Sequence, residues 1–128
     1  MARVLIVDDE EVYRTYLSNW LVHEGHDVRS APNGHEAIIT AKAFLPHILI
    51  VDWLLKNDYY GLQVAEAVQD LTPELKTILI TGYPSEGLRR DARQAQVFRF
   101  MEKPFHMSDL STAVRDAARS QSDEELKT

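Results

Sequence analysis

Short, uninterrupted apolar runs alternate along this chain with segments of helical period. Residues 4–7, 48–51 and 77–80 are almost entirely apolar, and weaker runs occupy 27–31 and 97–101. Apolar strands without polar alternation are typical of a parallel sheet that helices cover on both faces. Between the runs, at about residues 11–24, 35–45, 62–71, 85–95 and 109–119, apolar side chains recur three or four positions apart. The alternation predicts a series of β-α units around one buried sheet.

Five β-α units in 128 residues fill a single domain. Right-handed crossovers fold such units as an α/β, doubly wound three-layer sandwich of flavodoxin-like type, with a five-stranded parallel sheet in the order 2-1-3-4-5. We expect this domain over residues 1–119, with Ser108 as the N-cap of the last helix. Residues 120–128 are polar and are expected to form a C-terminal tail or the start of a linker.

The balance of charge limits which partners this chain binds directly. Twenty Asp and Glu outnumber fourteen Lys and Arg, and the net charge of −6 argues against direct binding of nucleic acid or an anionic membrane. No apolar run approaches the roughly 20 residues of a membrane span, and the residues before the first run are too few for a signal peptide. The lack of cysteine excludes a disulfide framework and a thiol nucleophile. We therefore expect a cytoplasmic protein.

Polar residues stand at the carboxyl ends of four of the predicted strands. Asp8 and Asp9 follow the first, Asp52 ends the third, Thr81 the fourth, and Lys103 follows the fifth. In a doubly wound sheet these ends share one edge, where ligands bind beside the switch point between strands one and three. Two carboxylates about 4 Å apart repel by roughly 4 kcal/mol near a protein surface, so three of them in one site would raise their own pKa values or need a cation. Lys103 supplies one positive charge, and a hard divalent ion such as Mg²⁺ would supply the rest.

Taken singly, most of these residues also have ordinary structural explanations. Asp9 could cap the helix that follows it, Thr81 could belong to a turn, and Lys103 could be a solvated lysine. Asp52 is harder to explain in this way, because no helix start follows it for several residues. The common placement of the set at strand ends favours a functional site.

Four motifs, each at a strand end and in chain order, resemble the receiver domain of response regulators in two-component signal transduction, the CheY-like superfamily. They are the apolar run that ends in Asp8-Asp9-Glu10, the run that ends in Asp52, Ile80-Thr81-Gly82, and Lys103-Pro104-Phe105. The likeness extends from Arg3 to about Arg119. It implies a phosphoprotein in which Asp52 accepts a phosphoryl group from the phosphohistidine of a sensor histidine kinase or a histidine phosphotransfer protein.

The resemblance also implies a metal site. Asp9 and Asp52 would bind Mg²⁺, or Mn²⁺ in its place, directly. Asp8 would act mostly through water, and the main-chain carbonyl of Leu54 would be a further ligand. Such a protein is not an enzyme with a substrate to turn over; it is a phosphoacceptor that assists its own phosphorylation and dephosphorylation.

A conformational switch is implied as well. Thr81 and Lys103 would contact the phosphoryl oxygens, and Phe100 occupies the aromatic switch position of the family. Movement of Thr81 toward the phosphoryl group would let Phe100 turn inward and reshape the face formed by the last two helices and the fifth strand. The output then goes to a downstream protein, to a fused effector domain, or to a homodimer formed on phosphorylation.

Two other classes remain as alternatives. One is an aspartyl-phosphate-forming hydrolase or phosphotransferase of haloacid-dehalogenase type. Enzymes of that class carry an Asp-x-Asp pattern after the first strand, whereas here Asp8 and Asp9 are adjacent. The other is a flavodoxin-type binding module, but this chain lacks a Ser/Thr-rich phosphate loop after the first strand.

Further predictions concern the cis or trans state of one peptide bond, one loop, and two groups of side chains outside the cluster at the strand ends. The Lys103-Pro104 peptide bond is predicted to be cis, because a lysine that points into the pocket directly before proline needs a sharp reversal. The loop over residues 53–60 is longer than is usual in the family, and Lys56 is interpreted as a solvated residue of that loop. A basic stretch, formed by arginines 89, 90, 93 and 99, is either a solvated face or a contact surface. The first helix carries three aromatic residues, which are interpreted as packing and surface residues: Tyr13, Tyr16 and Trp20.

Overall fold

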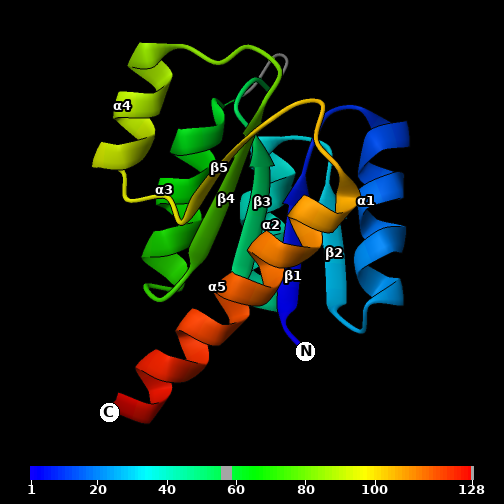
Figure 1. Cartoon of the computed structure of the whole chain (residues 1–128), viewed down its shortest axis with the longest axis vertical. Coiled ribbons are helices and arrows are strands. Elements are labelled where there is room, and N and C mark those ends of the chain that lie inside the picture. Colours follow the sequence, from blue (N-terminus) through cyan, green and yellow to red (C-terminus); the bar gives the residue numbers. More distant parts are fainter. Residues whose placement is uncertain (56–58, 128) are drawn as a thin grey trace.

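The computed structural model describes residues 1–55 and 59–127, with side chains as far as residue 120. Within these residues strands and helices alternate along the whole chain (Figure 1). The strands are β1 (Arg3–Val7), β2 (Asp27–Ala31), β3 (Ile48–Asp52), β4 (Lys76–Thr81) and β5 (Arg99–Glu102). The helices are α1 (Glu11–His23), α2 (Gly34–Phe44), α3 (Gly61–Leu71), α4 (Glu86–Gln94) and α5 (Met107–Lys127).

The strands form one parallel sheet in the order β2-β1-β3-β4-β5, which confirms the predicted fold class. β1 and β3 are central neighbours, with Val4 paired to Ile48 and Val7 to Val51. Because the chain crosses to β2 on one side of β1 and to β3 on the other, the switch point lies between β1 and β3. Their carboxyl ends therefore mark the expected binding edge.

Helices cover both faces of the sheet in three layers. Figure 1 shows α1 and α5 on one face, and α2, α3 and α4 on the other. Leu17 and Leu21 of α1 and Leu110 of α5 are buried against the first face, while Val64 of α3 and Leu88 of α4 are buried against the second. Both faces of each central strand are thus removed from water, which explains why these strands are apolar without alternation.

Local capping positions several of the helices. The Asn33 side chain accepts a hydrogen bond from the Glu36 amide at the start of α2 (2.8 Å), and Ser85 accepts one from the Leu88 amide at the start of α4 (3.0 Å). α2 ends at Phe44, one residue earlier than expected, because Leu45 adopts a left-handed conformation (φ 49°) as its C-cap.

The C-terminal helix differs from its prediction at both ends. α5 begins at Met107, so Ser108 lies inside its first turn and is not its N-cap. The helix continues to Lys127, through residues predicted to be a polar tail. Gln, Glu, Leu and Lys are good helix formers, so this segment continues the helix without a fully apolar face.

The fifth strand is shorter than predicted. β5 begins at Arg99 and not at Val97. Gln96 has a positive φ of 58°, and the Val97 amide donates a hydrogen bond back to the Ala92 carbonyl (3.1 Å). Residues 97 and 98 therefore belong to the connection from α4.

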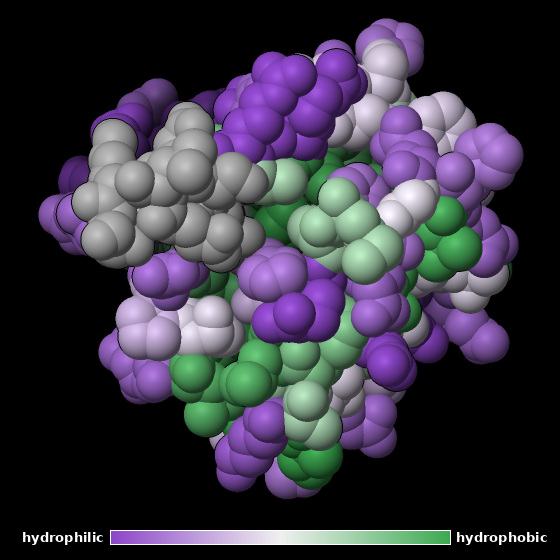
Figure 2. Space-filling model, turned by 90° about the horizontal axis from the view of Figure 1, so that it is seen from below, coloured by the Kyte–Doolittle hydropathy of each residue, from purple (hydrophilic) through white to green (hydrophobic). Residues whose placement is uncertain are grey.

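The amino-terminal edge of the sheet is stabilised by bonds from side chains to the main chain. The Arg3 guanidinium donates to carbonyls at the end of α2, with Nε–O distances of 3.0 and 3.1 Å. His26 Nδ1 accepts from the Ala2 amide (3.2 Å), and His47 Nδ1 accepts from the Arg3 amide (2.9 Å). Figure 2 looks onto this edge and shows hydrophilic and hydrophobic residues interspersed. Among the residues described, no helix is both long and apolar enough to span a bilayer.

Candidate functional site

Three side chains from three strand ends meet at the carboxyl edge of the sheet. Asp8 directly follows β1, Asp52 is the last residue of β3, and Lys103 directly follows β5. The Lys103 ammonium lies 2.7 Å from Asp52 Oδ2 and 3.4 Å from Asp8 Oδ2. The Lys103-Pro104 bond is cis, as predicted. One cation is therefore shared between two carboxylates that come from opposite sides of the switch point.

Asp8 is the most deeply buried of these charged groups. The residue is only 2% exposed, and its Oδ1 accepts a hydrogen bond from the Glu10 amide (2.8 Å). Burial raises the pKa of the Asp8 carboxyl, and the nearby Asp52 charge adds to this, although the Glu10 amide and Lys103 oppose it. The surroundings of Asp8 therefore stabilise its ionised form less well than water would.

The ammonium of Lys103 is fixed from more than one side. Burial by itself would lower the pKa of Lys103, but the hydrogen bond with Asp52 and the charges of Asp8 and Asp52 outweigh it, so that the pKa is raised. The same ammonium lies 4.3 Å from the centre of the Tyr13 ring. Burial raises the pKa of the Tyr13 phenol to about 12, so the ring faces the lysine as a neutral phenol.

The backbone after Asp52 is shaped by close packing. Asp52 Oδ1 accepts from the Leu54 amide (3.1 Å), and the Gly61 amide donates to the Trp53 carbonyl (2.8 Å). A Cβ atom on Gly61 would stand 2.5 Å from the Asp52 carbonyl oxygen, so only glycine lets α3 begin this close to β3. The Trp53 ring stacks on Tyr60, with centroids 5.0 Å apart. Lys56 and the middle of this loop lie outside the described residues.

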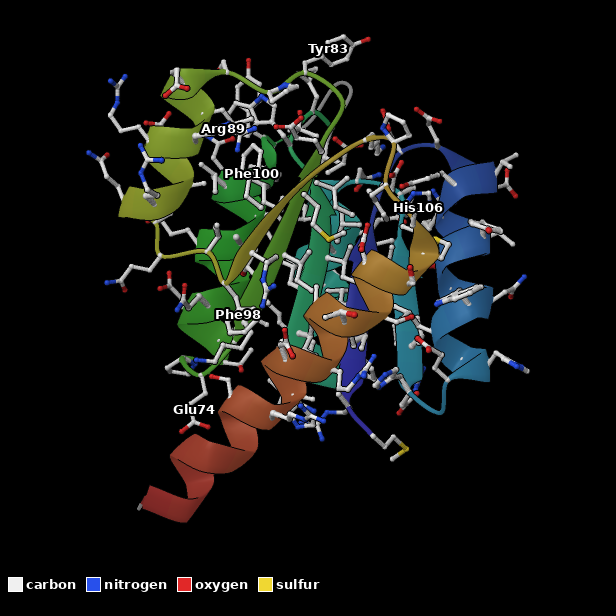
Figure 3. All side chains as sticks on the ribbon, in the orientation of Figure 1. Glu74, Tyr83, Arg89, Phe98, Phe100 and His106 are labelled. Carbon is white, nitrogen blue, oxygen red and sulfur yellow. The ribbon has the colours of Figure 1, made fainter. Side chains whose placement is uncertain are left out.

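Thr81 and Phe100 lie on the same face of the sheet, the face that α4 covers. Thr81 is buried at the end of β4, and its Oγ1 accepts from the Tyr83 amide (3.0 Å). Phe100 pairs in register with Leu79, so it lies diagonally beside Thr81 and not directly opposite it. Figure 3 shows Arg89 of α4 next to Phe100, and the guanidinium carbon lies 4.8 Å from the ring centre.

The predicted metal ligands all lie near the carboxyl edge of the sheet, but the described contacts link only some of them to one another. Asp8 and Asp52 are linked through Lys103, while Asp9 is half-buried beside Asp8 and Leu54 is exposed after β3. Within the described side chains, no three His, Asp or Glu residues form a ready-made metal cluster. The donor set still suits a hard cation, because carboxylates outnumber ammonium groups and Mg²⁺ commonly keeps several waters in place of protein ligands.

The basic stretch is tied into the fold more closely than a purely solvated face. Arg89 forms an ion pair with Glu102, and Arg99 pairs with Asp116 at 3.1 Å. Sequence reasoning did not connect Arg89 with Phe100, because the contact joins a helix to a strand across the α4–β5 connection.

Tyr13 is the pocket residue that sequence reasoning missed. Its place five residues after Asp8, in the first turns of the helix that follows β1, is the one signal that puts it near the carboxyl edge. Of the other aromatic residues in α1, Trp20 donates to Ser111 Oγ of α5 (2.8 Å) and Tyr16 is exposed, in line with packing and surface roles.

The order of the strands places the chain in the class of doubly wound parallel α/β proteins, in which ligands bind at the carboxyl ends of the strands, and here two acids and a lysine meet at that edge. Within that class, the chain belongs to the response regulator receiver domain family, whose model matches residues 4–115. This membership selects the receiver over the haloacid-dehalogenase and flavodoxin alternatives.

Relatives and solved structures agree with the family match. The chain is 27% identical over 110 residues to the response regulator receiver protein CpdR of Brucella abortus, covering 86% of this chain and 91% of that protein. It is 31% identical over 120 residues to the transcriptional regulatory protein TrcR of Mycobacterium tuberculosis, covering 94% of this chain. The chain spans 46% of the length of TrcR and 58% of the response regulator protein VraR of Staphylococcus aureus.

Two solved structures are similar across the chain. A CheY-like receiver domain protein from Methanospirillum hungatei superposes with a TM-score of 0.91 at 25% identity, covering 97% of this chain and 98% of that one. A response regulator from Burkholderia pseudomallei superposes with a TM-score of 0.83 at 29% identity, covering 100% of this chain and 75% of that one. That structure is described as holding a phosphorylated aspartic acid, a calcium ion and citrate.

Proposed function

We propose that this chain is a phosphoacceptor in which Asp52 receives a phosphoryl group from the phosphohistidine of a sensor histidine kinase or a histidine phosphotransfer protein. The observation that carries the proposal is the Lys103 ammonium shared between Asp52 at 2.7 Å and Asp8 at 3.4 Å, at the end of β3 in a receiver-family chain. Family membership places the chain in two-component signalling, and the pocket supplies the candidate acceptor.

The proposed reaction is a simple displacement at phosphorus. A carboxylate oxygen of Asp52 attacks in line, a P–O bond forms, and the P–N bond to the donor histidine breaks, so that neutral imidazole leaves with a proton from solvent. Asp52 needs no general base because the carboxylate is already the nucleophile. Lys103, which bonds Asp52 before the reaction, is in reach to neutralise negative charge on a phosphoryl oxygen.

Mg²⁺, or Mn²⁺, is the cation that we propose for the same pocket. Asp9, Asp52 and the Leu54 carbonyl would bind it directly, with Asp8 mostly through water. The burial of Asp8 and the 3.4 Å between its carboxylate and the Lys103 ammonium support a further cation there, since a nearby positive charge would stabilise the ionised form. When bound, the ion would neutralise charge on the phosphoryl oxygens.

The proposed output is a change on the face of α4, β5 and α5. Thr81 would move toward the phosphoryl group, and Phe100 would turn into the space that it leaves. Their diagonal placement on one face of the sheet supports this coupling, because the two side chains lie on the same side. A bias of a few kcal/mol is enough to shift such a two-state equilibrium by orders of magnitude.

We further propose that the protein works in the cytoplasm and relays its state to a downstream protein, to an effector domain in the same polypeptide, or to a second copy of itself. This chain matches only 46% of the length of TrcR, a transcriptional regulatory protein, which is compatible with a fused effector domain. The phosphoacceptor assists its own phosphorylation and dephosphorylation and is not a turnover enzyme.

Intact mass spectrometry after incubation with acetyl phosphate tests the proposal. Wild-type protein should gain about 80 Da with Mg²⁺ present and lose this gain on chelation, and Asp52→Asn should gain nothing. Asp70→Asn is the matched control, because it makes the same change at an exposed position of α3. An adduct that persists in Asp52→Asn and after chelation would refute the proposal.

A further inference from the structure

The ammonium of Lys103 contacts two kinds of neighbour. Carboxylate oxygens of Asp52 and Asp8 lie 2.7 and 3.4 Å away, and the centre of the Tyr13 ring lies 4.3 Å away. A cation within about 6 Å of a ring centre is attracted to the negative face of the ring. The lysine is therefore held by an aromatic contact as well as by ion pairs.

Tyr13 lies between the segment that follows β5 and the end of β1, and contacts from both sides position it. Its ring makes an edge-to-face contact with Phe105, with centroids 6.4 Å apart and planes at 75°, and Phe105 is only two residues beyond Lys103. On the other side, Arg14 Nη1 donates to the Asp8 carbonyl (2.7 Å) and ties the first turns of α1 to the end of β1. The ring of Tyr13 therefore packs between Phe105 and the Lys103 ammonium at the carboxyl edge.

The two kinds of contact respond differently to phosphorylation. Asp52 Oδ2 is the partner of Lys103 before the reaction, but an Asp52 oxygen becomes part of an anhydride when the phosphoryl group is added. The Tyr13 ring does not change. A long lysine side chain has many rotamers, and losing one ion-pair partner would release several of them.

We propose that Tyr13 is a positioning residue of the phosphoacceptor site, whose ring face keeps the Lys103 ammonium at the carboxyl edge while its carboxylate partner is being converted. The inference rests on the proposed function of Asp52. It assigns the effect to the ring face and not to the hydroxyl group, so phenylalanine should replace tyrosine and an aliphatic residue should not.

The first measurement is spectroscopic and independent of phosphorylation. Protons above an aromatic face are shifted upfield, so NMR of the Lys103 ε-methylene and ammonium protons should show this shift in wild type and in Tyr13→Phe. The shift should be lost in Tyr13→Leu and in Tyr13→Met, which provides a second aliphatic replacement. Tyr16→Leu, at an exposed position of the same helix, should leave the shift unchanged.

The second measurement is the rate of the mass gain with Mg²⁺ and acetyl phosphate, taken over a range of donor concentrations. Tyr13→Leu and Tyr13→Met should lower the maximal rate by about threefold to thirtyfold, with little change in the half-saturating donor concentration. Tyr13→Phe should stay within about twofold of wild type, and Tyr16→Leu should match wild type. Thermal denaturation of each variant shows that it is folded.

Two results would overturn the inference. One is a wild-type rate and an unchanged Lys103 shift in Tyr13→Leu. The other is a Tyr13→Phe variant as slow as Tyr13→Leu, which would transfer the effect from the ring face to the hydroxyl group. Failure of the proposed function itself is a different result, in which wild-type protein gains no mass at all.

Discussion

The two edges of the sheet both carry ionisable side chains but use them differently. At the carboxyl edge, Lys103 forms ion pairs with Asp8 and Asp52, and each acid also accepts a bond from a main-chain amide. At the amino edge, Arg3 and His26 bond to main-chain carbonyl and amide groups. One edge gathers charges of the same sign around a single ammonium, and the other satisfies the ends of strands and helices.

This difference shows what a perturbed pKa does and does not indicate. Burial lowers the pKa of His26 at the amino edge and raises that of Asp8 at the carboxyl edge. Only the second group faces another charged side chain across the switch point of the sheet. A perturbed pKa therefore points to a functional site when the geometry also brings reactive groups together. Substitutions should affect chemistry at one edge and stability at the other.

Removal of the shared ammonium should have the largest effect. In Lys103→Ala, the rate of mass gain with acetyl phosphate and Mg²⁺ should fall by about 10² to 10³, as when a charge-stabilising donor is lost. Lys76→Ala, at the amino end of β4, is the matched control and should keep the wild-type rate. Equal rates in the two variants would remove the functional distinction between the edges.

Thr81→Ala should separate chemistry from response within the carboxyl edge. The acyl phosphate should still form, but the surface near Phe100 should no longer respond to it. Fluorine or methyl NMR of probes near Phe100, with beryllofluoride in place of the phosphoryl group, measures this response in wild type and variant. Identical shifts on activation in both proteins would show that the coupling does not pass through Thr81.

Arg3→Ala should affect stability alone. Loss of the guanidinium leaves carbonyls at the end of α2 without their donor, which should lower the free energy of unfolding by about 1–3 kcal/mol. Urea denaturation measures the change, and Arg90→Ala, at an exposed position of α4, is the control. A marked loss of phosphorylation rate in folded Arg3→Ala would contradict the division of roles.

The smallest expected effect is the pH dependence contributed by His26. Burial, and next the N-terminal ammonium, lower its pKa below the ordinary 6.5, while Glu24 acts in the opposite direction. Below pH 6.5 the unfolded chain binds this proton more readily than the folded chain, so the free energy of unfolding should fall as the pH falls through the folded pKa.

Urea denaturation between pH 7.5 and 5 measures this dependence. His26→Gln should show a shallower decline than wild type, whereas His106→Gln, at an exposed position, should follow wild type. A decline as steep in His26→Gln as in wild type would assign the proton uptake to other groups.

The strands and the strand-end residues were predictable from sequence because each depends on a local pattern, and the strand order followed from the usual topology of five β-α units with right-handed crossovers. The apolar runs at 4–7 and 48–51 fit a sheet buried on both faces, and Asp8 and Asp52 must then stand at its carboxyl edge. The length of α5 was not predictable in this way, since residues 120–127 are helical without a clear apolar face. The place of Tyr13 depends on how α1 packs against the connection from β5, which no local pattern specifies.

The central claim is that Asp52, and not Asp8 or Asp9, carries the phosphoryl group. Borohydride reduces an acyl phosphate to the alcohol and releases phosphate, so tandem mass spectrometry of peptides from treated protein locates the modified carboxyl. The account predicts reduction at residue 52 alone, dependent on Mg²⁺ and acetyl phosphate. Reduction at Asp8 or Asp9, or a mass gain that borohydride does not remove, would contradict it.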